Sequence, residues 1–155
     1  MDASLAEHFF EEAAAEAKKS LCLRDKCGAI VVRDGKIIGC GYNAPPNDDV
    51  TLRKCDLDLM RSPKPKSDRT CCVHAEWRAI IDAIRSEKML GGSTLFFTRV
   101  DADGKILRSG RPYCTACSRL ALDNGIGFFA LWHDNGIQIY DTKEYNELSY
   151  RFHEQ

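Results

Sequence analysis

Cys72-Val73-His74-Ala75-Glu76 and Pro112-Tyr113-Cys114-Thr115-Ala116-Cys117 are the two stretches of the sequence that decide the fold. Each stands where a helical pattern begins, the first over residues 74–88 and the second over residues 115–124. A Cys-x-x-Cys pair at a helix start lets both sulfurs reach one ion, and a histidine from the other helix start adds a third ligand. The chain must therefore fold so that the starts of these two helices meet.

The residue types in these stretches are those of a catalytic zinc site. Three protein ligands leave a fourth position open, whereas a structural zinc ion normally has four protein ligands. Zinc lowers the pKa of a water molecule to about 7, and a nearby carboxylate can then carry protons. The sequence predicts His74, Cys114 and Cys117 as ligands of one catalytic Zn²⁺, and Glu76 as the catalytic proton carrier. The pattern H-x-E with P-C-x-x-C is the signature of zinc deaminases.

Helices and strands alternate around these two stretches. Asp34-Gly35 between two β-rich runs is a strong hairpin signal, and Ser4 with Glu7 predicts the start of an amphipathic helix. The order helix, hairpin, helix, strand, helix, strand, strand, helix predicts an α/β protein whose mixed sheet has helices on both faces. The expected helices are 4–19, 74–88, 115–124 and 142–152, and the expected strands are 29–33, 36–41, 93–100, 126–132 and 137–140, with a small hairpin extension at 105–107.

The segment from about 44 to 70 breaks this regularity. It contains four of the five prolines, many charges and little periodicity, which is typical of a long surface insertion. We interpret residues 1–155 as one domain that carries this inserted loop, because the length suits a single core.

Composition and charge limit the classes of function. The formal net charge is −1, and the absence of a basic excess argues against nucleic acid as partner. No apolar run approaches the about 20 residues that span a bilayer, and the acidic start lacks the layout of a signal peptide. We therefore expect a cytoplasmic protein without membrane contact. Its eight cysteines are expected as metal ligands or buried thiols rather than disulfides.

The sequence resembles the cytidine and deoxycytidylate deaminase superfamily, and most closely its deoxycytidylate (dCMP) deaminase branch. The resemblance covers roughly residues 5–141 and includes, besides the two zinc motifs, Ser20-Leu21-Cys22-Leu23-Arg24, Gly28-Ala29-Ile30-Val31-Val32 and Gly41-Tyr42-Asn43. The long insertion before His74 is also similar to that branch.

This resemblance implies a three-layer α/β/α, cytidine-deaminase-like fold with a five-stranded mixed sheet. It implies hydrolysis of a 4-amino pyrimidine to a 4-oxo pyrimidine with release of ammonia, most specifically dCMP to dUMP. It gives His74, Cys114 and Cys117 as zinc ligands, Glu76 as proton shuttle and Asn43 as a contact to the sugar. It also implies a small-molecule nucleotide or nucleoside as partner and a homo-oligomer as the assembly.

The sequence departs from the family pattern in two places. Tyr113 stands between Pro112 and Cys114, where the family usually has proline directly before the first cysteine. The stretch from His74 to Cys114 is also longer than usual, through residues 101–111. Neither change removes a ligand, but both alter the rim beside the metal and therefore bear on the identity of the substrate.

Several further residues are candidates for substrate binding, each with a structural alternative. Ala75 lies between His74 and Glu76, Trp77 and Tyr113 could stack on a base or pack in the core, and Asn43 could be a turn residue ahead of Pro45-Pro46. Arg24, or one or two basic residues of the insertion, could bind a nucleotide phosphate, whereas a solvated mixed-charge loop is the alternative. The basic residues of the insertion are Arg53, Lys54, Arg61, Lys64, Lys66 and Arg69.

Other interpretations of the same motifs stay open. Cys114 and Cys117 could form a redox pair, and Cys55, Cys71 and Cys72 could bind a second, structural zinc ion, although no Cys-x-x-Cys spacing supports it. The substrate could instead be a free nucleoside, a nucleobase, a modified pyrimidine or a polynucleotide. The chain could also be a zinc-stabilised binding module without catalysis.

Overall fold

A single mixed β-sheet forms the centre of the molecule. The computed structural model describes residues 1–55, 70–86 and 88–152. Five strands follow the order β2-β1-β3-β5-β6, and a two-residue strand, β4, pairs with β3 beside this path. Among the described strands, β3 and β5 pair in parallel, and the other pairs are antiparallel. The strands are β1 (Lys26–Arg33), β2 (Lys36–Tyr42), β3 (Thr94–Val100), β4 (Ile106–Leu107), β5 (Phe128–His133) and β6 (Gly136–Asp141).

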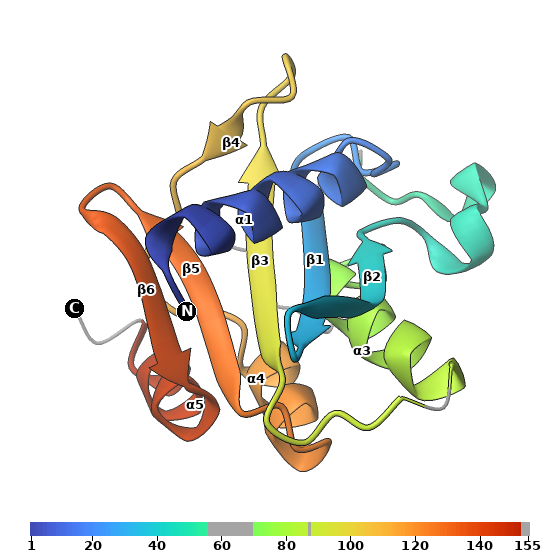
Figure 1. The fold of residues 1–155 in the computed structure, drawn as a ribbon. Coiled ribbons are helices and arrows are strands. Elements are labelled where there is room, and N and C mark those ends of the chain that lie inside the picture. The colour runs from blue at the N-terminus through green and yellow to red at the C-terminus, as the bar shows by residue number, and fades with distance from the viewer. Residues whose placement is uncertain (56–69, 87, 153–155) are drawn as a thin grey trace.

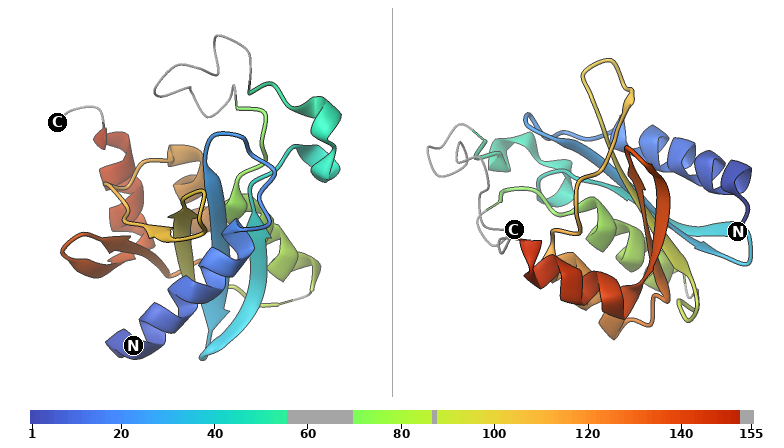
Figure 2. Two further views of the ribbon diagram at one scale, coloured as in Figure 1. Left: turned by 90° about the horizontal axis from the view of Figure 1, so that it is seen from above. Right: turned by 90° about the vertical axis from the view of Figure 1, so that its left-hand side faces the viewer.

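Helices cover both faces of the sheet (Figures 1 and 2). Helix α1 lies across one face, and α3, α4 and α5 lie on the other. This arrangement confirms the three-layer α/β/α fold, with the short β4 added to the expected five strands. The helices are α1 (Ala3–Ala17), α3 (Ala75–Arg85), α4 (Thr115–Asp123) and α5 (Thr142–Tyr150), with two 3₁₀ turns, η1 (Pro46–Asp48) and η2 (Val50–Leu52).

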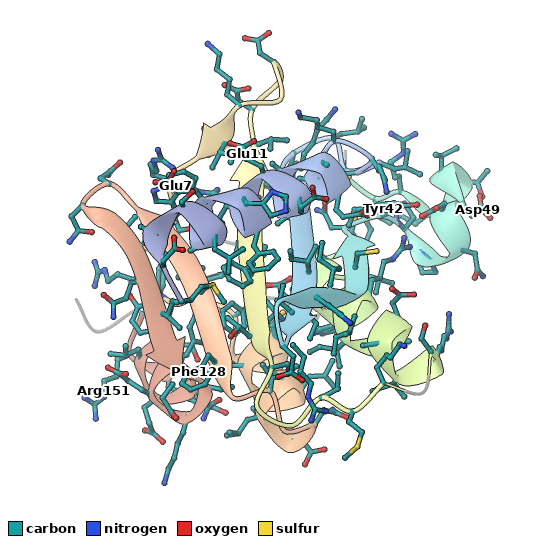
Figure 3. The ribbon with its side chains drawn as sticks, in the orientation of Figure 1. Glu7, Glu11, Tyr42, Asp49, Phe128 and Arg151 are labelled. Atoms are coloured by element: carbon teal, nitrogen blue, oxygen red, sulfur yellow. The ribbon has the colours of Figure 1, made fainter. Side chains whose placement is uncertain are left out.

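Strand β1 is buried on both faces because each face meets a helix layer. Ile30 and Val32 pack with Phe9 and Phe10 of α1. The intervening residues of β1, Ala29 and Val31, point to the opposite side and pack with α3, α4 and α5. Two cores therefore share one sheet, and Glu7 and Glu11 project from the outer face of α1 toward solvent (Figure 3).

Glycines in β1 and β2 let the helices approach the sheet closely. A Cβ atom added at Gly28 would lie 2.1 Å from the carbonyl oxygen of Ala13 in α1. A Cβ atom added at Gly41 would lie 2.6 Å from the carbonyl oxygen of Ala75, in the first turn of α3. The missing side chain at Gly41 therefore sets how deep the start of α3 lies against the sheet.

The hairpin prediction is confirmed, whereas the predicted start of the first helix is wrong. Asp34 and Gly35 form the tight turn between β1 and β2 with φ angles of 51° and 71°. The first helix begins at Ala3, and its N-cap is Asp2, whose side chain accepts a hydrogen bond from the Leu5 amide. Ser4 lies inside the first turn because the stronger acceptor, the Asp2 carboxylate, stands two residues earlier.

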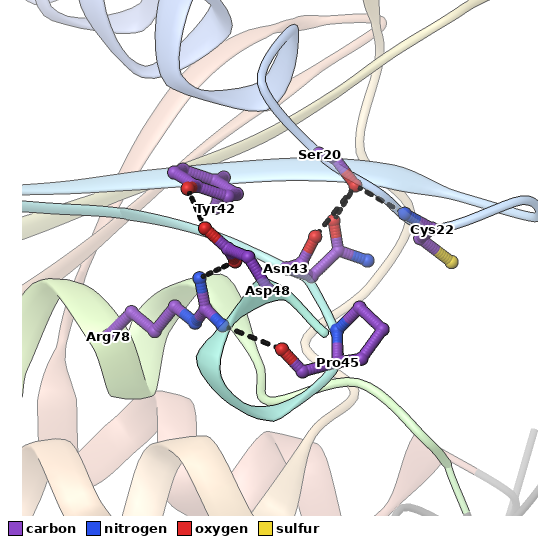
Figure 4. Close-up of polar contacts among 7 residues, drawn as sticks. All are labelled: Ser20, Cys22, Tyr42, Asn43, Pro45, Asp48 and Arg78. Atoms are coloured by element: carbon purple, nitrogen blue, oxygen red, sulfur yellow. Dashed lines mark hydrogen bonds and ion pairs between the residues drawn. The ribbon is translucent and has the colours of Figure 1, made fainter. Parts of the chain in front are cut away.

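The described part of the insertion, residues 44–55, is held to the domain by a polar network (Figure 4). Arg78 of α3 donates to the Asp48 carboxylate at 2.8 Å and to the Pro45 carbonyl at 3.0 Å, and Tyr42 donates to Asp48 at 2.6 Å. Tyr42 and Asp49 lie on the same side of the molecule, far from Phe128 and Arg151 (Figure 3). The basic candidates Arg61, Lys64, Lys66 and Arg69 lie outside the described residues.

In the part of the chain that the structure describes, no helix is both long enough and apolar enough to cross a bilayer.

Candidate active site

One imidazole and two thiols meet where α3 and α4 begin. His74 is the N-cap residue of α3, and Cys114 is the N-cap residue of α4, so both have extended backbones and lie at the helix starts. One ligand atom from each of His74, Cys114 and Cys117 lies within 4.8 Å of the others. Imidazole nitrogen and thiolate sulfur are the donors that zinc prefers, so this donor set fits the predicted ion.

The orientation of His74 identifies the nitrogen that faces the metal position. Its Nδ1 lies 3.1 Å from the sulfur of Cys117 and 3.5 Å from the sulfur of Cys114. Its Nε2 lies 3.4 Å from the hydroxyl oxygen of Thr70. A ligating Nδ1 leaves the ring proton on Nε2, which can donate to Thr70 and thereby hold the ring in place.

Trp77 supports the same imidazole from behind. Its ring stacks on His74 with a centroid distance of 4.8 Å and an interplanar angle of 15°. Trp77 does not belong to the residues that line the cavity beside His74. Its position is therefore that of a residue that packs against the ligand, and its predicted contact with a base stays a prediction.

The electrostatics of the ligands already favour a negative sulfur beside a positive ring. The hydrogen bond with Cys117, followed by the contact with His74, lowers the pKa of Cys114 to about 4. Burial opposes the charged form of His74, but the hydrogen bond with Cys114 and the charge of Glu76 outweigh it and raise the pKa of the imidazole. Burial raises the pKa of the Cys117 thiol. A divalent cation in this position would replace the positive charge of the ring.

Glu76 is a buried carboxyl group next to the ligands. Only 5 % of the residue is exposed, and it interacts with the Cys117 thiol. Burial raises the pKa of this carboxyl, and the charge of Cys114 raises it further against the opposing effect of His74. A carboxyl in such surroundings can both accept and hold a proton, which is the property that acid–base catalysis requires.

A cavity of about 390 Å³ opens onto these groups. His74, Ala75, Glu76 and Cys114 form its inner wall, together with Tyr145, Leu131 and Phe97. Tyr145 is buried and stacks on Phe129 with a centroid distance of 3.8 Å, which fixes the apolar side of the wall. The volume lies in the range of cavities that hold small molecules.

Asn43 lines this cavity and joins three segments of the chain. Its side-chain oxygen accepts hydrogen bonds from the Ser20 hydroxyl and, at 2.9 Å, from the Cys27 amide. Its side-chain nitrogen donates to the Asp25 carbonyl at 2.8 Å. Within the described ranges its second N–H has no hydrogen-bond acceptor, and the residue is one of those that line the cavity.

The rim of the cavity comes from segments that are distant in sequence. Arg24 and Tyr113, both predicted from the sequence, are exposed there. Sequence reasoning missed Ser109, Arg111 and Phe152, which lie at the same mouth. The Phe152 ring lies 4.7 Å from the Tyr113 ring and 5.9 Å from the Arg111 guanidinium carbon, and only the unusual length of residues 101–111 signalled part of this rim.

Five further cysteines line the same cavity, namely Cys22, Cys27, Cys55, Cys71 and Cys72. The sulfurs of Cys55 and Cys71 lie 3.6 Å apart, and all eight cysteines are free thiols. Among the described residues, however, His74, Cys114 and Cys117 are the trio whose ligand atoms gather closely enough to hold a metal. The geometry therefore gives a second zinc ion no support comparable to that of the catalytic position.

Comparisons with known proteins agree with this geometry. The sheet with helices on both faces, and the His-Cys-Cys trio beside a buried carboxyl, define the class of zinc-dependent hydrolytic deaminases. A sequence profile described as the cytidine and deoxycytidylate deaminase zinc-binding region matches residues 3–127. The chain therefore belongs to the cytidine and deoxycytidylate deaminase family, which confirms the resemblance and the predicted catalytic zinc.

Individual relatives point to the same branch. The deoxycytidylate deaminase of Mycobacterium phage D29 is 35 % identical over 126 residues, which cover 77 % of this chain and 88 % of that protein. The Schizosaccharomyces pombe deoxycytidylate deaminase is 33 % identical over 81 residues, 50 % of this chain but only 25 % of that longer protein. The dCMP deaminase of cyanophage S-TIM5, crystallised with dCMP and dUMP, superposes with a TM-score of 0.62 at 26 % identity, covering 83 % of this chain and 81 % of that one.

Proposed function

We propose that this enzyme hydrolyses dCMP to dUMP and ammonia. The observation that carries the proposal is the trio of His74, Cys114 and Cys117 beside the buried Glu76 carboxyl, where His74, Cys114 and Glu76 line one cavity of about 390 Å³. The choice of dCMP rests on the similarity to proteins named deoxycytidylate deaminase.

The chain's own residues account for the proton movements of the reaction. When bound to His74, Cys114 and Cys117, Zn²⁺ makes a water molecule acidic enough to act as a nucleophile near neutral pH. The Glu76 carboxylate accepts a proton from the water that attacks C4 of the ring and delivers it to N3. It then passes the second water proton to the 4-amino group, which leaves as ammonia, so that cytosine and water become uracil and ammonia.

The substrate contacts follow from the position of each group around the cavity. The second side-chain N–H of Asn43 is available to an oxygen of the sugar, and the backbone of Ala75 borders the ring between His74 and Glu76. Tyr113 lies at the mouth, next to the ligand Cys114, where its ring can cover a base. We therefore assign the base to the inner end of the cavity and the phosphate to its mouth.

Positive charge at the mouth supports a nucleotide over a nucleoside. Arg24, Arg99 and Arg111 all line the cavity, and the acidic residue among its lining at this end is Asp25, which pairs with Arg99 at 3.6 Å. Guanidinium groups bind phosphate oxygens through paired hydrogen bonds. We assign the 5′-phosphate to this end, with Arg24 as a direct contact.

A substrate panel tests the proposal. Ammonia release would be measured with dCMP, deoxycytidine, CMP, cytosine and a single-stranded oligonucleotide, with zinc content determined on the same sample. We expect the highest kcat/KM with dCMP and a value for deoxycytidine that is lower by at least about tenfold, the effect of one charge-assisted contact.

Each alternative has its own outcome in this panel. A preference for deoxycytidine or cytosine would reassign the substrate and remove the phosphate from the mouth. Turnover of the oligonucleotide alone would indicate polynucleotide editing. Zinc binding without turnover of any compound would indicate a binding module.

We also propose a cytoplasmic homo-oligomer. Eight free thiols suit a reducing compartment. Ile81 and Ile84 of α3 and Leu122 of α4 are exposed apolar side chains of the kind that subunit contacts cover. Light scattering on the zinc-loaded protein would test the assembly, because a monomer at micromolar concentration would contradict it.

A further inference from the structure

The chain between β4 and the ligand Cys114 is fastened to the end of β5. The Ser109 amide donates to the Trp132 carbonyl at 2.7 Å, and the Arg108 guanidinium lies 3.7 Å above the Trp132 ring. The cavity rim includes the three residues that follow Arg108, namely Ser109, Gly110 and Arg111. The position of this rim is thus set by β5 rather than by β4 alone.

His133, the last residue of β5, makes the second attachment. Its Nδ1 lies 3.0 Å from the Ser109 carbonyl oxygen, and its Nε2 lies 2.8 Å from the Tyr140 hydroxyl. A carbonyl oxygen only accepts, so Nδ1 must carry the proton. In the neutral ring Nε2 is then an acceptor, and Tyr140 donates to it, which fixes both the tautomer and the orientation of the ring.

This attachment lies between two hollows. Ser109, Gly110 and Arg111 line the catalytic cavity on one side and, on the other, a hollow of about 470 Å³ that His133 and Tyr140 also line. The three residues therefore form a partition between the two hollows. Among the residues described, His133 is the one whose side chain contacts the Ser109 carbonyl oxygen. After Arg111 the chain reaches Cys114 through the buried Pro112, so the same partition leads into the ligand helix.

We propose that His133, held by Tyr140, is a positioning residue that sets where the Ser109–Arg111 rim meets the substrate. The inference rests on the proposed function, because it assigns this rim to the nucleotide. His133 is neither one of the three metal ligands nor one of the residues that line the catalytic cavity. Its loss should therefore weaken substrate binding and leave the chemical step and the zinc site nearly intact.

Two substitutions separate the two hydrogen bonds of the ring. In His133→Asn the amide nitrogen takes the place of Nδ1 and can still donate to Ser109, whereas in His133→Gln the amide lies where Nε2 was and reaches Tyr140 only. We expect His133→Gln to raise KM for dCMP roughly fivefold to tenfold, the effect of one neutral hydrogen bond, with kcat changed less than about twofold. His133→Asn should restore most of the affinity, and Tyr140→Phe should fall between them.

Two further measurements accompany the kinetics. Zinc content of each variant shows whether the ligand helix is intact, and His8→Gln on α1 is the matched histidine control. Nitrogen-15 NMR of histidine-labelled wild type should show His133 protonated on Nδ1. An unchanged KM in His133→Gln, a fall in kcat or zinc content instead, or a proton on Nε2 would overturn the assignment.

A failure of the proposed function can be distinguished from a failure of the positioning role. If the wild type does not deaminate dCMP, the substrate assignment is wrong whatever the variants do. If the wild type deaminates dCMP and His133→Gln binds it equally well, the positioning role alone is wrong.

Discussion

The inner wall and the rim of the cavity are built in different ways. The inner wall takes His74 and Glu76 from one helix start and Cys114 from another, and the third ligand, Cys117, lies in the first turn of that second helix. The rim takes Arg24 from the segment before β1, Arg111 from the segment after β4, and Phe152 from beyond α5. The reactive groups therefore depend on local helix geometry, whereas the proposed substrate contacts depend on how separate loops meet. The two regions should respond differently to substitution.

The largest expected effect lies on the inner wall. Glu76→Gln should lower kcat on the order of 10²–10⁴-fold, because the amide cannot carry the protons that the reaction moves. Zinc content should stay at the wild-type value, since Glu76 is not one of the three ligands. Glu7→Gln on the outer face of α1 is the control. Near-normal ammonia release by Glu76→Gln would remove Glu76 from the mechanism.

The next effect concerns the support beneath the inner wall. Gly41→Ala should reduce the free energy of unfolding by about 1–3 kcal/mol, because the new methyl group overlaps the backbone of Ala75 and Ala79 in α3. Denaturant unfolding of the reduced, zinc-free protein measures this change in the free energy of unfolding. Gly91→Ala, where an added Cβ meets no atom within 4 Å, should change stability little. Equal effects of the two substitutions would contradict the close approach of α3.

A rim substitution should act on affinity rather than stability. Arg24→Ala should raise KM for dCMP about tenfold, roughly 1.4 kcal/mol, through loss of a charge-assisted contact to the phosphate. The KM for deoxycytidine should hardly change, which separates a phosphate contact from general damage. Arg85→Ala, at the far end of α3, serves as the charge-matched control. Steady-state kinetics with both substrates decide the matter, and an equal loss for both would refute the phosphate contact.

The smallest effect is a pH dependence at the base of the insertion. Hydrogen bonds from Tyr42 and Arg78 hold the pKa of Asp48 below its usual value. A lowered folded-state pKa stabilises the fold above the unfolded pKa, and this contribution is lost as pH falls through the folded value. Asp48→Asn should therefore cost less than about 1 kcal/mol at pH 7, because the pair is partly solvent-exposed. Unfolding curves should converge near pH 2, and a difference that grows with acidity would contradict the assignment.

The inner wall could be predicted from the sequence, because His74 and Glu76 lie within three residues and Cys114 and Cys117 within four. When residues lie this close together at a helix start, the helix geometry alone largely determines how their side chains are oriented relative to one another. The Asp34-Gly35 hairpin was predictable for the same reason: two residues with positive φ determine the turn.

The rim could not be predicted in this way. Phe152 and Arg111 come into contact because the chain passes through α4, β5, β6 and α5 between them. No local sequence pattern predicts such a long-range contact. Asn43 shows the intermediate case. Its place near the cavity followed from the family resemblance, but its bonds to Ser20, Cys27 and Asp25 follow from the pairing of β1 with β2.

The two cysteine ligands have a consequence for how a nucleotide can enter. As thiolates, Cys114 and Cys117 contribute two negative charges, which formally cancel the charge of a divalent cation held between them and the neutral His74 ring. A bare dication at the end of the cavity would attract the phosphate and favour a reversed nucleotide. Electroneutrality at that end, with the buried Glu76 beside it and the arginines at the mouth, would remove this competition, which favours the proposed orientation with the base inward.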